Sequence, residues 1–269
     1  MTLLDRLGAL HPGASRRTLK QWLERGRVEV AGAVVRDGRV SIGPGDRVAL
    51  RAGGEVPFPP RLRLVHEDAA LLVIDKPPGL LSIASERERE RTAYRLIWDY
   101  LAAGRPPRRP FVVHRLDRDT SGLLVFAKSP AAKQKLQEQF EMRTAERVYL
   151  AVVEGRVRAD AGSLASRLRH DRALRVSSGP AGKLAITHYR VLARRRDTTA
   201  LEIVLGTGRR HQIRVQLAEM GHPIAGDREH GSRTDPFGRL ALHARRLALV
   251  HPSTGRAVSF ESAPPPGWV

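Results

Sequence analysis

The hydrophobic residues of the first fifty positions recur first at helical spacing and then in short alternating runs. Leucines predict a first helix through Leu3, Leu4, Leu7 and Leu10. A second helix is predicted over residues 16–25, with Ser15 as its N-cap and Gly26 as its end. The apolar face of this helix consists of Leu19, Trp22 and Leu23. Short strands are predicted at residues 28–30, 34–35, 40–42 and 48–50.

Longer apolar runs begin after a segment that interrupts this pattern. Residues 51–60 contain two glycines and three prolines, which predict a linker. Beyond it, buried strands are predicted at residues 64–65, 71–74, 111–113, 123–127, 147–153, 183–189, 201–205, 240–242 and 247–249. Helices are predicted at residues 92–102, at residues 131–142, and from an N-cap at Thr207 to a stop at Gly221. The pattern indicates a chain of mixed α and β structure built largely of antiparallel sheet, whereas residues 156–182 show no clear element.

The chain carries a large excess of positive charge. Its 47 lysines and arginines outnumber 28 acidic residues, and the formal net charge is +19. This balance favours a polyanionic partner. The charge is spread along the chain, and no basic amphipathic helix carries an aromatic face, so nucleic acid is favoured over a membrane surface.

Two absences narrow the class of protein further. The chain has no cysteine, which excludes disulfides and thiolate metal sites. No apolar run approaches the roughly 20 residues that a membrane span requires, and the N-terminus lacks the apolar core of a secretory signal. We therefore expect an intracellular, cytoplasmic protein.

The polar cluster with the most evident chemistry lies between two predicted strands, at residues 111–113 and 123–127. It consists of His114, Arg115, Asp117, Arg118 and Asp119, after which the Thr-Ser-Gly sequence at residues 120–122 turns the backbone. A catalytic carboxylate requires such a placement at the end of a strand, and neighbouring arginines favour its charged form. By itself, the R-x-D-R pattern favours a solvated loop with a surface ion pair over a catalytic site.

Three strings resemble motifs of one enzyme family. HRLDRDTSGLLVFAKS, residues 114–129, closely resembles the active-site motif of the RluA-type pseudouridine synthases, which convert uridine in RNA to its C-glycoside isomer. RVYLA at residues 147–151 is similar to the family's K-x-Y-x-A motif, and TGRRHQIRV at residues 207–215 to its T-G-R-x-H-Q-I-R-V-H motif. The resemblance implies that Asp117 is the catalytic aspartate, that Tyr149 stacks on the target base and that Arg214 pairs with Asp117. Two residues depart from these motifs, Arg147 in place of lysine and Gln216 in place of histidine.

The resemblance covers nearly the whole chain and implies its fold. KPPGL, residues 76–80, is similar to the segment that opens the synthase domain, although Lys76 itself reads as an incidental lysine on a prolyl turn. We expect an α+β catalytic domain over residues 61–269, with a predominantly antiparallel mixed sheet of the pseudouridine synthase type crossed by a cleft. The resemblance further implies that Arg115, Arg209 and His211 contact RNA.

The first fifty residues resemble a different module. SRRTLKQWLERGRVEVAG, residues 15–32, followed by GDRV at residues 45–48, is similar to the RNA-binding module of ribosomal protein S-four. The resemblance implies a small α/β domain over residues 1–51, joined by the linker at residues 52–60. Its basic helix would contact RNA phosphates through Arg16, Arg17 and Lys20. A solvated helix face explains the same charges.

Isomerisation of uridine changes no oxidation state and loses no group, so we expect no cofactor and no metal. A metal site at His211 lacks a third ligand at a recognised sequence spacing. The expected substrate is structured RNA, ribosomal RNA first and transfer RNA second, and the expected state is a monomer. Two alternatives remain open. One is an RNA-binding or ribosome-assembly factor without chemistry; the other is a nucleoside glycosidase, which normally needs a pair of carboxylates.

Overall fold

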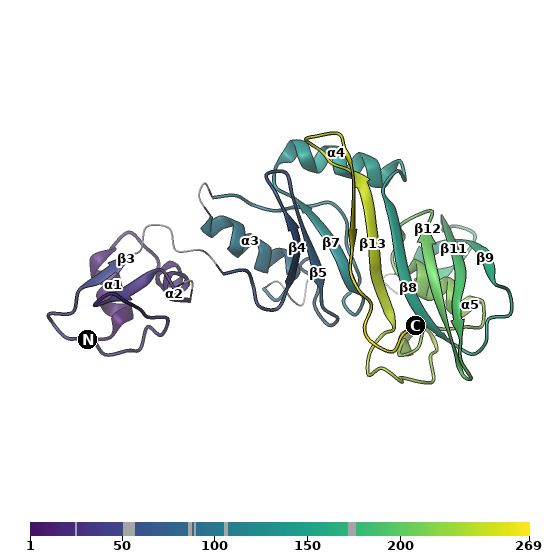
Figure 1. Cartoon of the computed structure of the whole chain (residues 1–269), viewed down its shortest axis with the longest axis horizontal. Coiled ribbons are helices and arrows are strands. Elements are labelled where there is room, and N and C mark those ends of the chain that lie inside the picture. Colours follow the sequence, from purple (N-terminus) through teal and green to yellow (C-terminus); the bar gives the residue numbers. More distant parts are fainter. Residues whose placement is uncertain (25, 51–56, 86–87, 89, 105–106, 172–175) are drawn as a thin grey trace. The chain divides into compact units, whose positions relative to one another are not determined.

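The computed structural model describes residues 1–24, 26–50, 57–85, 88, 90–104, 107–171 and 176–269. The chain divides into two compact units (Figure 1): Met1–Phe58 with Tyr100–Arg108, and Pro59–Asp99 with Arg109–Val269. Residue 25 of the second predicted helix and residues 51–56 of the predicted linker lie outside the described residues. Within the described parts, no helix is both long and apolar enough to cross a membrane.

The first unit packs two helices, α1 (Leu3–Leu10) and α2 (Arg16–Glu24), with a small antiparallel sheet. The strands of this sheet are β1 (Val28–Val30), β2 (Ala33–Val34) and β3 (Val48–Leu50), in the order β2-β1-β3. The Ser15 hydroxyl accepts from the backbone N–H of Thr18 at 3.1 Å, which confirms the predicted cap. The strand predicted at residues 40–42 is reduced to an isolated antiparallel bridge between Ser41 and Thr2, while Val40 is exposed and Ile42 packs into the core.

The second unit is built on one large sheet. Its strands are β4 (Arg63–Glu67), β5 (Leu71–Lys76), β6 (Phe111–Val112), β7 (Ser121–Ala127), β8 (Glu146–Glu154), β9 (Ala161–His170), β10 (Val176–Ser178), β11 (Lys183–Arg194), β12 (Thr198–Leu205), β13 (Leu242–Val250) and β14 (Ala257–Glu261). Among the described residues they follow the order β10-β9-β11-β12-β8-β13-β7-β5-β4, with β14 beside β13 and β6 beside β7. All these pairs are antiparallel except β7 with β13. The predicted α+β fold with a mainly antiparallel sheet is confirmed.

Helices cover this sheet because its central strands are apolar on both faces. The helices are α3 (Ala93–Ala103), α4 (Pro130–Glu141), α5 (Gln212–Glu219) and the short 3-10 helix η1 (Arg228–His230). Val125 of β7 belongs to the same core cluster as Leu136 of α4, whereas the adjacent Phe126 contacts Tyr94 of α3 with ring centroids 6.4 Å apart. Since successive strand residues point to opposite faces, α4 and α3 cover opposite faces of the sheet. Figure 1 shows α4 crossing the ends of β7 and β13.

The segment at residues 156–182 contains two strands that the sequence pattern does not indicate. β9 and β10 pair antiparallel, and β9 also pairs along its length with β11. Many of the β9 side chains are exposed, so the strand lacks the apolar run that marks a buried strand. A second difference concerns the strand predicted at residues 240–242, because Leu240 and Ala241 are buried but precede the start of β13.

Gly122 allows β7 to meet β13. Its φ of +108° is accessible to few residues other than glycine. A Cβ at this position would lie 2.3 Å from the backbone oxygen of Ala244. Glycine is therefore required at this position. Ser121 and Gly122 already pair within β7, so the turn predicted at residues 120–122 is wrong, and β7 starts directly after the predicted catalytic loop.

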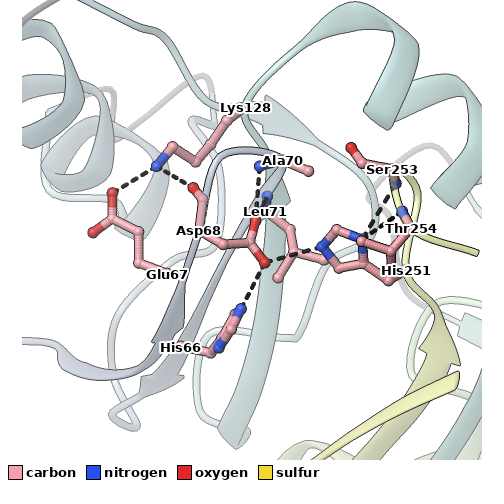
Figure 2. Close-up of polar contacts among 9 residues, drawn as sticks. All are labelled: His66, Glu67, Asp68, Ala70, Leu71, Lys128, His251, Ser253 and Thr254. Atoms are coloured by element: carbon pink, nitrogen blue, oxygen red, sulfur yellow. Dashed lines mark hydrogen bonds and ion pairs between the residues drawn. The ribbon is translucent and has the colours of Figure 1, made fainter. Parts of the chain in front are cut away.

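A polar cluster outside the cavity described below ties the β4–β5 hairpin to the end of β13 (Figure 2). The Asp68 carboxylate accepts from the ring Nε2 atoms of His66 and His251, at 2.7 and 2.9 Å. It also accepts from the backbone N–H groups of Ala70 and Leu71, at 2.7 and 2.9 Å. Four donors on one carboxylate stabilise its ionised form.

We expect Asp68→Asn to lower the free energy of unfolding at pH 7 by about 1–3 kcal/mol, because donors to the carboxylate lose their charged acceptor. Burial raises the pKa of Asp68. The hydrogen bonds that the carboxylate accepts from His66, Leu71, Ala70 and His251 together outweigh burial, so the net pKa lies well below the ordinary value. A depressed carboxylate pKa contributes stability above the unfolded pKa of about 3.9, and this stability is lost as the pH falls through the folded pKa. Denaturant titrations at pH 7, 5, 4 and 3 should show the difference between wild type and variant shrinking below pH 4. A difference that stays constant across this range would contradict the assignment.

Candidate active site

A cavity of about 500 Å³ lies on one face of the large sheet, with α4 lining one side and the start of α5 another. Six of the residues predicted from the sequence to form the site line this cavity: Asp117, Tyr149, Arg214, Arg115, Arg209 and His211. The other three are exposed on α2 in the first unit, and are Arg16, Arg17 and Lys20. The fold thus brings together six predicted residues from three separate segments of the second unit.

The loop that carries Asp117 is fixed by hydrogen bonds on both sides of the carboxylate. The Ser82 hydroxyl donates to the carbonyl of Leu116 at 2.7 Å and accepts from the N–H of the same residue at 3.0 Å. The Lys76 ammonium donates to the carbonyl of Arg118 at 2.9 Å. With its neighbours held in this way, Asp117 has little freedom to move its backbone.

Lys76 is a structural part of the site, and its interpretation as an incidental lysine is wrong. It is fully buried and also donates to the carbonyls of Pro77 at 2.9 Å and Leu80 at 2.8 Å. Burial lowers the pKa of Lys76 to about 7, and the charges of Asp119 and Asp117 oppose this decrease. An ammonium group supplies three donors, which match the three carbonyls. Only the tertiary structure shows that the third carbonyl comes from the loop that carries Asp117.

The Asp117 carboxylate faces two basic side chains in the cavity, those of His211 and Arg214. His211 Nε2 lies 3.9 Å from one carboxylate oxygen, and Arg214 Nη1 lies 3.8 Å from the other. The Asp117 side chain is 19% exposed, so the carboxylate remains open to a ligand. Asp119, two residues later, is exposed, and its charge acts on Lys76 and Arg239.

Arg214 is held more tightly by other carboxylates than by Asp117. Its Nε and Nη2 donate to the two oxygens of Asp227 at 2.7 and 2.6 Å, and Nη2 also donates to Glu229 at 2.8 Å. Burial lowers the pKa of Arg214, but the hydrogen bond and charge of Asp227 and the charges of Asp117 and Glu229 raise it above the ordinary value. Sequence reasoning did not identify Asp227 as a site residue. The signal that could have identified it is the GHPIAGD string at residues 221–227, which ends with this aspartate.

The helix that carries Arg214 begins later than predicted. Thr207 does not cap it; its hydroxyl accepts from the N–H of Ile186 at 2.9 Å and donates to the Gln212 side chain at 2.7 Å. His211 precedes the helix in a left-handed conformation with a φ of 49°. This conformation turns the imidazole toward Asp117, so His211 and Arg214 approach the same carboxylate.

Two residues that sequence spacing does not connect with His211 lie beside it. The ligand atoms of His211, Glu229 and His230 all lie within 4.8 Å of one another, so three side chains could hold a metal ion. Sequence reasoning found no third ligand at a recognised spacing and missed this cluster, because His230 comes 19 residues after His211 in the chain. The three groups already have other partners. His211 Nδ1 lies at hydrogen-bond distance, 3.2 Å, from His230 Nε2, and Glu229 accepts from Arg214. Burial lowers the pKa of both histidines, which favours neutral rings.

Tyr149 lies in β8 and lines the cavity with 7% of its surface exposed. Burial raises the pKa of its phenol to about 12, with the charge of Arg147 opposing and that of Asp117 supporting the increase. The phenol is therefore neutral at physiological pH. Its contribution to a binding site is an aromatic surface with a protonated hydroxyl.

Gln216, which replaces the histidine of the family motif, faces the sheet instead of the cavity. Its side-chain amide donates to the carbonyls of Leu164 at 3.3 Å and Ala185 at 3.1 Å, and to the Ser166 hydroxyl at 3.1 Å. These contacts attach α5 to β9 and β11. The residue therefore has a structural role in this chain.

Comparison with known proteins identifies the fold and the chemistry together. The family model described as RNA pseudouridylate synthase matches residues 70–219, which include Asp117, Tyr149 and Arg214. The chain belongs to this family. It is an RNA pseudouridine synthase, an isomerase that takes RNA as its substrate.

The synthase has relatives of similar length in several bacteria. It is 36% identical to "Ribosomal large subunit pseudouridine synthase D" of Pseudomonas aeruginosa, over 97% of this chain and 88% of that protein. It is 37% identical to the RNA pseudouridine synthase YlyB of Bacillus subtilis, over 93% of this chain and 86% of that protein. The solved structure of human RNA Pseudouridylate Synthase Domain Containing 1 is 23% identical and covers 76% of this chain and 84% of its own length, with a TM-score of 0.63. That structure shares the fold of the large unit.

Proposed function

We propose that this synthase isomerises uridines of large-subunit ribosomal RNA. The proposal is supported by relatives at 33–36% identity whose names specify the ribosomal large subunit, among them proteins of Pseudomonas aeruginosa, Pasteurella multocida and Haemophilus ducreyi. The net charge of +19 suits a large folded RNA. Transfer RNA is the second candidate substrate.

The single observation that carries the mechanism is an open carboxylate in a lined cavity. Asp117 lies 3.8 Å from Arg214 and 3.9 Å from His211, and it shares the cavity with Tyr149. Isomerisation requires cleavage of the glycosidic bond, rotation of the uracil and formation of a bond from its C5. A carboxylate beside the ribose can serve as nucleophile or base in that sequence. Arg214, with Nη1 3.8 Å from a carboxylate oxygen of Asp117, orients that carboxylate.

The target nucleotide must leave its stacked position to reach Asp117, because a base within an RNA helix is not accessible to a carboxylate. Tyr149 supplies a neutral aromatic surface for the everted base. Arg115, Arg209 and His211 contact the surrounding RNA. A cavity of about 500 Å³ lies in the usual size range for a small-molecule site.

We propose that the first unit binds RNA through α2. Arg16, Arg17 and Lys20 are exposed on this helix, while Leu19 and Leu23 on its other face are buried. Replacing all three basic residues by glutamine should weaken RNA binding without changing the chemical step, and should reduce the slope of log affinity against log salt by about 2–3. Filter binding across a salt series and single-turnover rates at saturating enzyme measure the two effects. A lower single-turnover rate with unchanged affinity would contradict this role.

Mapping of pseudouridine in total RNA from cells with and without the gene tests the substrate. We expect one or more sites to disappear from large-subunit ribosomal RNA and to return with the wild-type gene but not with Asp117→Asn. Loss of sites from transfer RNA alone would overturn the ribosomal assignment. Free uracil released from purified RNA would favour a glycosidase. Sites restored by Asp117→Asn would favour a binding or assembly role in which Asp117 has no part.

We also propose that the synthase acts as a cytoplasmic monomer and needs no metal or cofactor. The expected result is a light-scattering mass near 29.8 kDa and unchanged turnover after treatment with a chelator. A mass twice this value would overturn the monomer. Activity that is lost on treatment with the chelator and restored by one divalent ion would show that the enzyme needs a metal.

A further inference from the structure

Arg147 is a buried cation in the active-site cavity, without an anionic partner among the residues that the structure describes. It is 9% exposed, and its Nε atom has no hydrogen-bond partner in the described part of the chain. Within the described parts of the chain, no carboxylate forms an ion pair with Arg147. A buried guanidinium without an acceptor is costly, since nothing replaces the water that it lost. A ligand that enters the cavity can supply that acceptor.

The strand and its neighbours aim this guanidinium at the cavity. Arg147 and Tyr149 are two residues apart in β8, so their side chains point to the same face of the sheet, and both line the cavity. The Phe140 ring of α4 lies 5.5 Å from the Arg147 Cζ. Gly208, on the segment before α5, leaves space for the guanidinium, because a Cβ there would lie 2.6 Å from Nη1.

The electrostatic surroundings favour an anion at this position. Besides Arg147 and Arg214, four more arginines line the cavity, Arg115, Arg143, Arg209 and Arg210, against two carboxylates, those of Asp117 and Glu141. The carboxylate that the proposed chemistry requires, Asp117, has Arg214 and His211 beside it. The excess cations are therefore available to a negatively charged part of the ligand. In RNA that part is the phosphate group.

We propose that Arg147 binds the phosphate that adjoins the target uridine, and so fixes the everted nucleotide with its base on Tyr149. This inference deepens the proposed function and rests on it. A planar guanidinium can donate two parallel hydrogen bonds to one phosphate, which fixes orientation as well as position. A contact to a base carbonyl would leave the charge of Arg147 uncompensated.

Titration of the full-length chain with uridine, uridine 5′-monophosphate and uridine 3′-monophosphate, followed by NMR chemical shifts, tests this site. The monophosphates stand in for the phosphates on either side of the nucleotide. We expect the wild type to bind one monophosphate at least about 10-fold more tightly than uridine, as a charge-assisted contact provides. Arg147→Gln should reduce that ratio to about 2 or less, with little change in the affinity for uridine.

Two further variants separate a phosphate contact from general effects of charge or folding. Arg147→Lys keeps the charge without the planar fork, and should retain an intermediate ratio. Arg190→Gln removes a charge of the same type from β11, where Arg190 pairs with Glu202 at 2.8 Å outside the cavity, and should match the wild type. Thermal melting of each variant checks the fold, and Arg147→Lys serves alone if Arg147→Gln does not fold.

An unchanged ratio in the Arg147 variants would overturn the proposal, and so would a wild type that binds uridine and both monophosphates equally. Failure of the proposed function gives a different result. In that case the monophosphate preference would depend on Arg147, but no pseudouridine of large-subunit ribosomal RNA would depend on the gene. If the enzyme isomerises ribosomal RNA but its preference for a monophosphate over uridine does not depend on Arg147, the proposed function holds and the phosphate site at Arg147 is excluded.

Discussion

Asp117→Asn is expected to lower the rate of uridine isomerisation by about 10⁴-fold or more, as removal of a reacting group does in other enzymes. Asparagine has nearly the same shape but can neither act as an anionic nucleophile nor accept a proton. Asp117 receives no hydrogen bond within the described structure, and its nearest cationic atom is 3.8 Å away. The substitution should therefore change the free energy of unfolding by only about 0.5 kcal/mol. RNA affinity should change by less than about 3-fold.

The matched control is Asp119→Asn, which makes the same chemical change two residues later. Asp119 is exposed, and its charge acts on Lys76 and Arg239 instead of facing His211 and Arg214. We expect it to retain turnover within a few-fold of the wild type. Rates come from single-turnover conversion of a ribosomal RNA transcript, read by tritium release from C5-labelled uridine. Full activity in Asp117→Asn, or a greater loss in Asp119→Asn, would remove Asp117 from its assigned role.

Asp227→Asn is expected to lower the free energy of unfolding by about 3 kcal/mol and turnover by about 10-fold or more. The Asp227 side chain is 1% exposed and binds the Arg214 guanidinium through two hydrogen bonds of 2.6 and 2.7 Å. Removing one charge of a buried pair leaves the other insufficiently compensated. Arg214 would then shift toward Glu229 and Asp117, and the Asp117 carboxylate would lose its position.

Asp160→Asn is the control for this second substitution. Asp160 pairs with Arg194 at a similar distance, 2.6 Å, but the Asp160 side chain is 90% exposed. An exposed pair contributes about 0–1 kcal/mol, so denaturant unfolding should barely distinguish this variant from wild type. Turnover should be unchanged. Equal losses of stability in the two variants would show that burial of the Arg214–Asp227 pair has no special effect.

Sequence reasoning predicted the elements whose patterns are local. The helices at 92–102 and 131–142 and the strand at 123–127 follow from apolar periodicity, and the structure places α3, α4 and β7 there. It did not predict β9, whose many exposed side chains form no apolar run. The cap at Thr207 was wrong for a related reason. The Thr207 hydroxyl accepts a hydrogen bond from the N–H of Ile186 and donates one to the side chain of Gln212, so it is not available to cap the helix.

The candidate site shows the same division. Asp117, Tyr149 and Arg214 were named from short motifs, in which the residue types stand at fixed local spacing. Lys76 and Asp227 were missed as functional neighbours because their partners are distant in sequence. Lys76 reaches the carbonyl of Arg118, 42 residues away, and Asp227 contacts Arg214 from a separate segment.

The sequence by itself determined the family, the basic character of the chain and the carboxylate around which the chemistry is proposed, because these properties depend on residue type and on spacing within a single segment. The three-dimensional arrangement was needed to show which carboxylates hold Arg214, that Lys76 supports the loop of Asp117, and that Arg147 faces the cavity without an anionic partner among the described residues. These are contacts between different elements of the chain. Their energies depend on burial and on distances of a few ångströms, which no local pattern of residues specifies.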